Sequence, residues 1–204
     1  MTLSCLSGNV VAALLRLGYE DDPRLWRAVG WLLEIQNADG GWLCPYWKAH
    51  VRDKHGCFFG TICSLEALAE IPPARRTPAL EKAAARGAEF LLRHHLYKAD
   101  HHGFRTIKAG WLKLGFPWFY RYDILRGLWV LTKLGYQDER MADALALLRE
   151  KRTPNGKWAL EVTPFGRMQA SLEPEGRPSK WITLYALWVL RGVHKSRLRN
   201  RLGP

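Results

Sequence analysis

The seven residues from Gln36 to Trp42, QNADGGW, end one predicted helix and begin a turn. The residues before them carry apolar side chains at helical spacing, which predicts an amphipathic helix. Gly40 and Gly41 stop this helix, because glycine readily adopts the left-handed backbone conformation that ends helices. We expect Trp42 to fold back as an apolar plug with one indole N–H donor. Gln36 is suited to bridge free backbone groups where neighbouring helix ends meet.

Similar segments recur along the chain with a period of roughly 58 residues. The predicted helix that ends at Gln36 reads RAVGWLLEIQ, the next one reads RGAEFLLRHH and ends at His95, and a third reads DALALLREKR and ends at Arg152. The third copy has its own turn, TPNGKW, in which Gly156 and Trp158 take the places of the turn glycine and the tryptophan. The period is too long for one helix pair of a tetratricopeptide or HEAT array, and it suits a long helix pair with sizeable loops.

The spacing of Gln36, Gly40 and Trp42 resembles the QW repeat of squalene–hopene and oxidosqualene cyclases. Through this repeat the chain resembles the terpenoid cyclase and protein prenyltransferase superfamily. The resemblance implies an α/α toroid, in which a ring of parallel inner helices lies inside an outer ring. The match is complete only in the first repeat, because His95 and Arg152 stand where the repeat has Gln. It therefore speaks for the fold more than for the chemistry, since function depends on sites rather than on folds.

The chain reads as helices that alternate between an inner and an outer set. Proline directly after a capping side chain marks the start of two outer helices. The predicted outer N-caps are Asp22, Thr77 and Asp138, and the predicted inner helices begin at Gly8, Phe59, Tyr122 and Ser179. The sequence thus predicts an all-α fold, a partial α/α toroid of about seven helices, with residues 1–193 as one domain and 194–204 as a basic tail.

A closed toroid of this superfamily has more helices than this, so the chain resembles the C-terminal part of a ring. A shortened relative, a fragment of a longer chain, and a protein that completes the ring by association all remain open. The first and last inner helices carry apolar residues on more than one side, including Leu14 and Trp188. Because large apolar patches are rarely exposed on monomers, we expect a two-fold homodimer through these helices.

The composition of the 204 residues, 48% hydrophobic and 12% aromatic, is sufficient for a substantial core. No apolar run is long enough to span a bilayer, and the chain does not open on a signal peptide. Four cysteines are few for this length, which favours a reducing compartment such as the cytoplasm. The formal charge of +12 favours an anionic partner. A diphosphate or an anionic membrane surface suits it better than nucleic acid, because no nucleic-acid module is recognisable.

Asp123 is the candidate catalytic acid. In class II terpene cyclases the middle Asp of a D-x-D-D motif, at the start of an inner helix, protonates a double bond or an epoxide. Asp123 occupies a comparable helix start, but it stands alone and no D-x-D-D motif surrounds it. The other interpretation is an ordinary helix N-cap.

Aromatic and basic residues gather at the predicted starts of the inner helices, where an apolar cavity with an anion site would form. The candidate cavity residues are Phe58, Phe59, Trp118, Phe119, Tyr120, Tyr122 and Trp181, and the candidate anion-binding residues are His55, Arg121 and Lys180. Core packing and solvated surface charge are the simpler interpretations of the two groups.

Zinc is considered because protein prenyltransferases hold a catalytic zinc with Asp, Cys and His. Cys44, His50, His55 and Cys57 lie in one loop, but the Asp that directly precedes the Cys in that family is missing here. No metal and no cofactor are therefore predicted.

Two functions remain open from the sequence. One is an isoprenoid enzyme that starts cyclisation, or other prenyl-diphosphate chemistry, in an aromatic cavity with Asp123 as acid. The other is a non-catalytic toroid that has lost the acid motif and binds a lipid or a protein.

Overall fold

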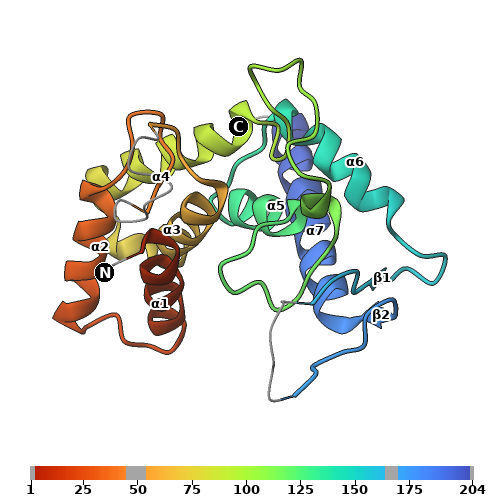
Figure 1. The fold of residues 1–204 in the computed structure, drawn as a ribbon, viewed down its shortest axis with the longest axis horizontal. Helices are drawn as coiled ribbons and strands as arrows, with labels where there is room; N and C mark the ends of the chain where they lie inside the picture. Colours follow the sequence, from red (N-terminus) through yellow and green to blue (C-terminus); the bar gives the residue numbers. More distant parts are fainter. Residues whose placement is uncertain (1–2, 45–53, 164–169, 203–204) are drawn as a thin grey trace. The chain divides into compact units, whose positions relative to one another are not determined.

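The computed structural model describes residues 3–44, 54–163 and 170–202 (Figure 1). Within these residues the chain forms seven α-helices and one short two-stranded sheet. It divides into two compact units, Met1–Leu91 and Leu92–Pro204, and each is described by itself. The helical class predicted from the sequence is confirmed, while the toroid stays a prediction.

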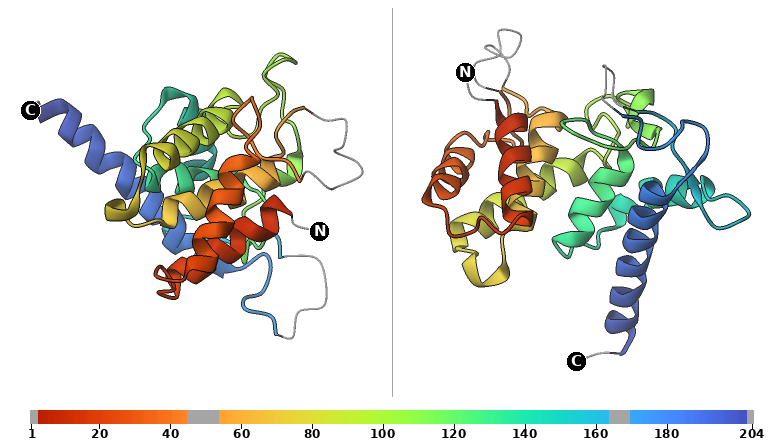
Figure 2. Two further views of the ribbon diagram at one scale, coloured as in Figure 1. Left: turned by 90° about the vertical axis from the view of Figure 1, so that its left-hand side faces the viewer. Right: turned by 90° about the horizontal axis from the view of Figure 1, so that it is seen from below.

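The first unit contains α1 (Ser4–Arg16), α2 (Pro23–Glu34), α3 (Phe58–Glu70) and the start of α4 (Pro78–Arg93), with a 3-10 turn at Pro73–Arg75. Helices α1 and α3 pack side by side (Figures 1 and 2). Their backbones approach closely at Gly8, where a Cβ atom would lie 2.4 Å from the carbonyl carbon of Cys63. Helix α3 is buried along almost its whole length and forms the centre of this unit.

The second unit contains α5 (Ile124–Lys133), α6 (Ala142–Glu150), α7 (Lys180–Leu202) and 3-10 turns at Ala109–Leu112 and Glu139–Met141. Helix α5 packs against both α6 and α7. Strands β1 (Trp158–Ala159) and β2 (Pro178–Ser179) pair antiparallel before α7. The predicted all-α fold did not include this small sheet.

The tryptophan turn has the same hydrogen bonds in both units. Trp42 is fully buried, and its indole Nε1 donates to the carbonyl of Leu32 at the end of α2 over 2.7 Å. Its backbone N–H donates to Thr61 Oγ1 in α3 over 2.9 Å. The indole of Trp42 thus satisfies a carbonyl that the end of α2 leaves free.

In the second unit the indole of Trp158 donates to the carbonyl of Leu148 over 2.6 Å, and its backbone N–H donates to Thr183 Oγ1 over 3.0 Å. The turn glycines Gly40 and Gly156 both have positive φ, 93° and 76°. The predicted correspondence of the two turns is therefore confirmed.

The predicted bridging by Gln36 is confirmed in part, because its second partner, Ala83, lies within α4 rather than at a helix end. Its Nε2 donates to the carbonyl of Gly40 over 2.8 Å and to the carbonyl of Ala83, in α4, over 2.9 Å. It thus ties the turn to α4. In the second unit His95 has no such amide, but its Nδ1 lies 3.8 Å from a carboxylate oxygen of Asp143 in α6.

The predicted N-caps are confirmed, while some helix starts shift. Side-chain oxygens of the following four residues accept backbone N–H groups of the first turn: Asp22, Thr77, Asp138 and Ser179. Helix α1 begins at Ser4 rather than Gly8, and α5 begins at Ile124 because Asp123 is its N-cap. Helix α7 continues through Leu202, so the basic segment after residue 193 extends that helix (Figure 2).

Among the described residues, none of the helices combines the length and the apolar character that crossing a bilayer requires.

Candidate functional site

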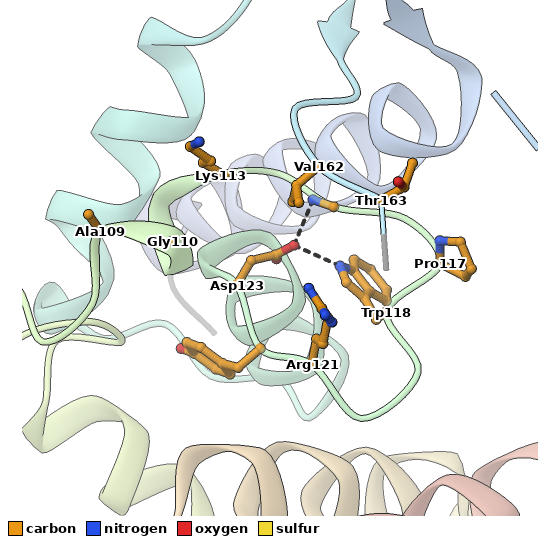
Figure 3. Close-up of a pocket in the computed structure, with 11 residues that line it drawn as sticks. Ala109, Gly110, Lys113, Pro117, Trp118, Arg121, Asp123, Val162 and Thr163 are labelled. Atoms are coloured by element: carbon orange, nitrogen blue, oxygen red, sulfur yellow. Dashed lines mark hydrogen bonds between the residues drawn. The ribbon is translucent and has the colours of Figure 1, made fainter. Parts of the chain in front are cut away.

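The second unit contains a cavity of about 350 Å³ beside the N-terminus of α5 (Figure 3). It lies between the segment that leads into α5 and the segment that follows β1. The lining residues are Ala109, Gly110, Lys113, Gly115, Pro117, Trp118, Arg121, Tyr122, Asp123, Val162 and Thr163. Four of the predicted site residues are among them, namely Trp118, Arg121, Tyr122 and Asp123. The cavity is large enough for a small organic ligand.

Asp123 is buried in the wall of this cavity and accepts three hydrogen bonds. Its Oδ1 accepts the backbone N–H of Arg126 over 2.8 Å, which makes it the N-cap of α5. Its Oδ2 accepts the backbone N–H of Gly115 and the indole Nε1 of Trp118, each over 2.9 Å (Figure 3). The cap therefore also fixes the loop and the aromatic wall around the cavity.

Burial raises the pKa of Asp123 from 3.8 to about 6, because desolvation outweighs the three hydrogen bonds and the nearby charge of Arg126, which lower it. A fraction of the side chain is thus protonated near neutral pH. However, all three donors point at the carboxylate as an acceptor, and a protonated, neutral Asp123 would be a weaker acceptor for each of them. The geometry suits an N-cap more directly than a proton donor.

Arg126 supports the site from behind its lining, and it was not predicted from the sequence. Its side chain is 2% exposed, and Nη1 donates to the carbonyls of Phe119 over 2.8 Å and Arg121 over 2.6 Å. Its guanidinium lies 5.9 Å from the centre of the Trp118 ring. This buried arginine holds the loop that precedes α5 in place. An arginine among apolar residues in a buried helix is the sequence feature that could have indicated such a role.

The predicted aromatic residues of the second unit separate into two groups. Trp118 and Tyr122 are buried at the cavity, and the Tyr122 hydroxyl donates to the carbonyl of Leu96 over 2.6 Å. Phe119 and Tyr120 are half exposed, at 54% and 49%. Trp181 is also exposed and stacks on Phe116 with ring centres 5.0 Å apart. Only the buried pair lines the cavity.

Phe58, Phe59 and His55 belong to the first unit. Phe58 is buried against Phe90, with ring centres 5.3 Å apart, which is the core-packing interpretation of this residue. His55 is exposed, and its Nδ1 lies 3.8 Å from a carboxylate oxygen of Asp39. The negative charge of this carboxylate would repel an anion placed at the histidine.

The basic residues of the cavity are Arg121 and Lys113. Arg121 was predicted, whereas Lys113 was not, because nothing in its local pattern distinguishes it from surface lysine. Lys180 is exposed, and its Nζ lies 6.0 Å from the centre of the Trp181 ring. Among the described residues that line the cavity, Asp123 is the single carboxylate. The cavity therefore combines an apolar wall with a positive rim.

The described residues considered for zinc belong to the first unit, whereas the cavity belongs to the second. Cys44 is buried beside Ser4 and Cys5, Cys57 is half buried before α3, and both are free thiols. His50 lies outside the described residues.

Comparison of this chain with family models, curated proteins and solved structures finds no match in any of the three. The site must therefore be interpreted from its own geometry.

Proposed function

We propose that the second unit binds a small amphiphile, an isoprenoid-type apolar chain that ends in a diphosphate. The observation that carries this proposal is the cavity of about 350 Å³ that places the Trp118 indole and two basic side chains, Lys113 and Arg121, around one space. Apolar ligand surface would lie against Trp118, Pro117 and Val162, where burial is favourable. The anionic end would face Lys113 and Arg121, because charge-assisted hydrogen bonds to phosphate oxygens are strong.

The hydrogen bonds of Asp123 favour ligand binding without catalysis. The carboxylate of Asp123 is engaged by three N–H donors, so its main contribution is to hold the walls of the cavity. The QW-repeat resemblance supports the same ligand class. We also propose that the inner and outer helices follow the order of an α/α toroid, which is supported by the equivalent turns at Trp42 and Trp158.

A second candidate is proton-initiated isoprenoid cyclisation with Asp123 as the acid. It is favoured by one observation, the pKa of Asp123 raised to about 6 by burial. Squalene and geranyl diphosphate are the substrates to assay, with product detection by gas chromatography. On this second proposal Asp123→Asn abolishes turnover, and absence of turnover by the wild-type protein excludes it.

Isothermal titration calorimetry tests the binding proposal with three probes: geranyl diphosphate, geraniol and inorganic pyrophosphate. We expect geranyl diphosphate to bind most tightly, because it alone uses both the apolar wall and the positive rim. Arg121→Ala and Lys113→Ala should each weaken its binding about tenfold, the equivalent of roughly 1.4 kcal/mol. The same substitutions should leave geraniol binding nearly unchanged.

Lys180→Ala is the matched control, because Lys180 is exposed and is not among the residues that line the cavity. Equal weakening by Lys180→Ala and Arg121→Ala would show that the diphosphate binds by general surface charge. Geraniol binding as tight as that of geranyl diphosphate would remove the role of the positive rim.

A further inference from the structure

Two thiols of the first unit lie together at the N-terminus of α1. Sγ of Cys5 and Sγ of Cys44 are 4.0 Å apart, although 39 residues separate them in the sequence. Cys44 is 8% exposed, while Cys5 is more accessible. The third residue of the group is Ser4, whose Oγ lies 3.4 Å from Sγ of Cys44. The fold thus brings a buried thiol and a partly exposed thiol close enough for a disulfide to form after a small movement.

The donors around Cys44 favour its thiolate. Its Sγ is within hydrogen-bonding distance of the Ser4 hydroxyl and the Cys5 thiol, which both lie in the first turn of α1. A helix N-terminus also carries partial positive charge. These hydrogen bonds, the one from Cys5 first, lower the pKa of Cys44 well below its ordinary value against the opposing effect of burial. Accordingly, the pKa of Cys5 is raised, because Cys5 keeps its proton as the donor.

Close packing holds the arrangement in place. On α3, Gly60 leaves room for the Ser4 side chain, since a Cβ atom there would lie 2.6 Å from Ser4 Oγ. Cys44 follows the buried Trp42 by two residues, so the tryptophan turn fixes where its backbone runs. The pair is therefore built by the core of the unit and not by a chance approach of surface side chains.

We propose that Cys44 and Cys5 form a redox-active dithiol that is oxidised by hydrogen peroxide, with Cys44 as the attacking thiolate and Cys5 as the resolving thiol. The Cys44 sulfur attacks one peroxide oxygen, the O–O bond breaks, and hydroxide leaves and takes up a proton to become water. Cys44 then carries a sulfenic acid. The Cys5 sulfur attacks Cys44 Sγ, the S–O bond breaks, and the hydroxyl leaves with the Cys5 proton as a second water. Two thiols lose two electrons, and one peroxide is reduced to two waters.

The test uses the full, fully reduced chain and one equivalent of hydrogen peroxide. Remaining thiols are blocked with N-ethylmaleimide, and peptides are identified by mass spectrometry. We expect a linked pair of peptides that contain Cys5 and Cys44, formed at least about tenfold faster than oxidation of Cys57. Dithiothreitol should restore both thiols.

Two variants separate the roles of the two cysteines. In Cys5→Ser the resolving step is lost, so dimedone should trap the sulfenic acid on Cys44. In Cys44→Ser rapid peroxide consumption should disappear. Cys57→Ser is the control, because Cys57 also precedes a helix and is also a half-buried free thiol, yet it should leave the reaction unchanged.

The measurement on the wild-type protein is decisive even where a variant does not fold. The proposal is overturned if Cys57 is oxidised first, if the only disulfides formed join two chains, or if the peptides of Cys5 and Cys44 stay unlinked after peroxide is consumed. Each of these results would mean that the two thiols only pack against each other.

Discussion

Replacing the turn tryptophan by phenylalanine should destabilise either unit strongly. In Trp42→Phe the carbonyl of Leu32, at the end of α2, loses the indole N–H that it accepts over 2.7 Å. An unsatisfied buried acceptor costs about 1–3 kcal/mol. The smaller ring also leaves a void of roughly 40 Å³, which adds about 1 kcal/mol, and the lost transfer free energy adds about 1 kcal/mol more. We therefore expect a loss of about 3–5 kcal/mol in the free energy of unfolding.

Trp158→Phe should cost a similar amount, because its indole is equally buried and donates to the carbonyl of Leu148 over 2.6 Å. Trp26→Phe is the matched control. The Trp26 indole also donates to a backbone carbonyl, that of Glu20, over 2.8 Å, but the side chain is partly exposed. Water can replace the lost donor there, so the expected cost is below about 1 kcal/mol.

The assay is urea unfolding followed by far-ultraviolet circular dichroism, with the wild type and the three variants under the same conditions. Because the chain forms two compact units, the transition is fitted separately where two steps are resolved. If Trp42→Phe and Trp26→Phe lower the free energy of unfolding by amounts within about 0.5 kcal/mol of each other, the reasoning is refuted. The buried indole would then stabilise the protein no more than a partly exposed one.

Three further predictions concern other parts of the chain. Asp123 has a pKa of about 6 in the folded protein and 3.8 in the unfolded chain, so its contribution to stability is complete below about pH 4 and is lost as pH rises through 6, by roughly 3 kcal/mol. Urea unfolding from pH 4 to 7 should show this loss of stability relative to Asp123→Asn. A stability difference between wild type and variant that rises with pH would mean that the hydrogen bonds outweigh burial. Gly40→Ala should lower the melting temperature far more than Gly18→Ala. Both glycines have positive φ, but of the two only Gly40 would bring a Cβ atom against another residue, the Arg86 carbonyl oxygen at 2.3 Å. Equal shifts of the melting temperature in the two variants would contradict this prediction. Trp188 is 42% exposed on α7. If it lies in a homodimer interface larger than about 1,200 Å², Trp188→Glu should convert the dimer to a monomer or an aggregate, which light scattering detects. A wild-type monomer at micromolar concentration would argue against this interface.

Local sequence was sufficient for the helices and their caps. Asp22 and Ser179 were recognisable because a capping oxygen acts on the next few residues and needs no distant partner. The errors in the helix boundaries are small. Helix α1 starts at Ser4 and not at Gly8, because Leu3 before it has no capping side chain that would mark the start in the sequence. The two-residue strands were missed because a single pair of strands depends on where distant segments meet.

The candidate site was only partly predictable. Asp123, Trp118 and Arg121 were identified because they stand at the start of an apolar helix, and all three line the cavity. Val162 and Lys113 were not, because they reach it from segments whose sequence carries no signal of that position. Phe119 was expected in the cavity and is instead 54% exposed, and its backbone has a positive φ of 44°, which the sequence does not predict for phenylalanine.

The sequence by itself determined the helical class, the recurrent turn and the role of its tryptophan, because each depends on periodicity and on groups within about one helical turn of a helix end. Only the tertiary structure decided which long-range pairs meet. It placed Cys44 at Cys5, and Trp158 at Thr183, across segments whose separation no local pattern encodes. It also set the environment of Asp123, because desolvation depends on everything packed around the carboxylate and not on its neighbours in the chain.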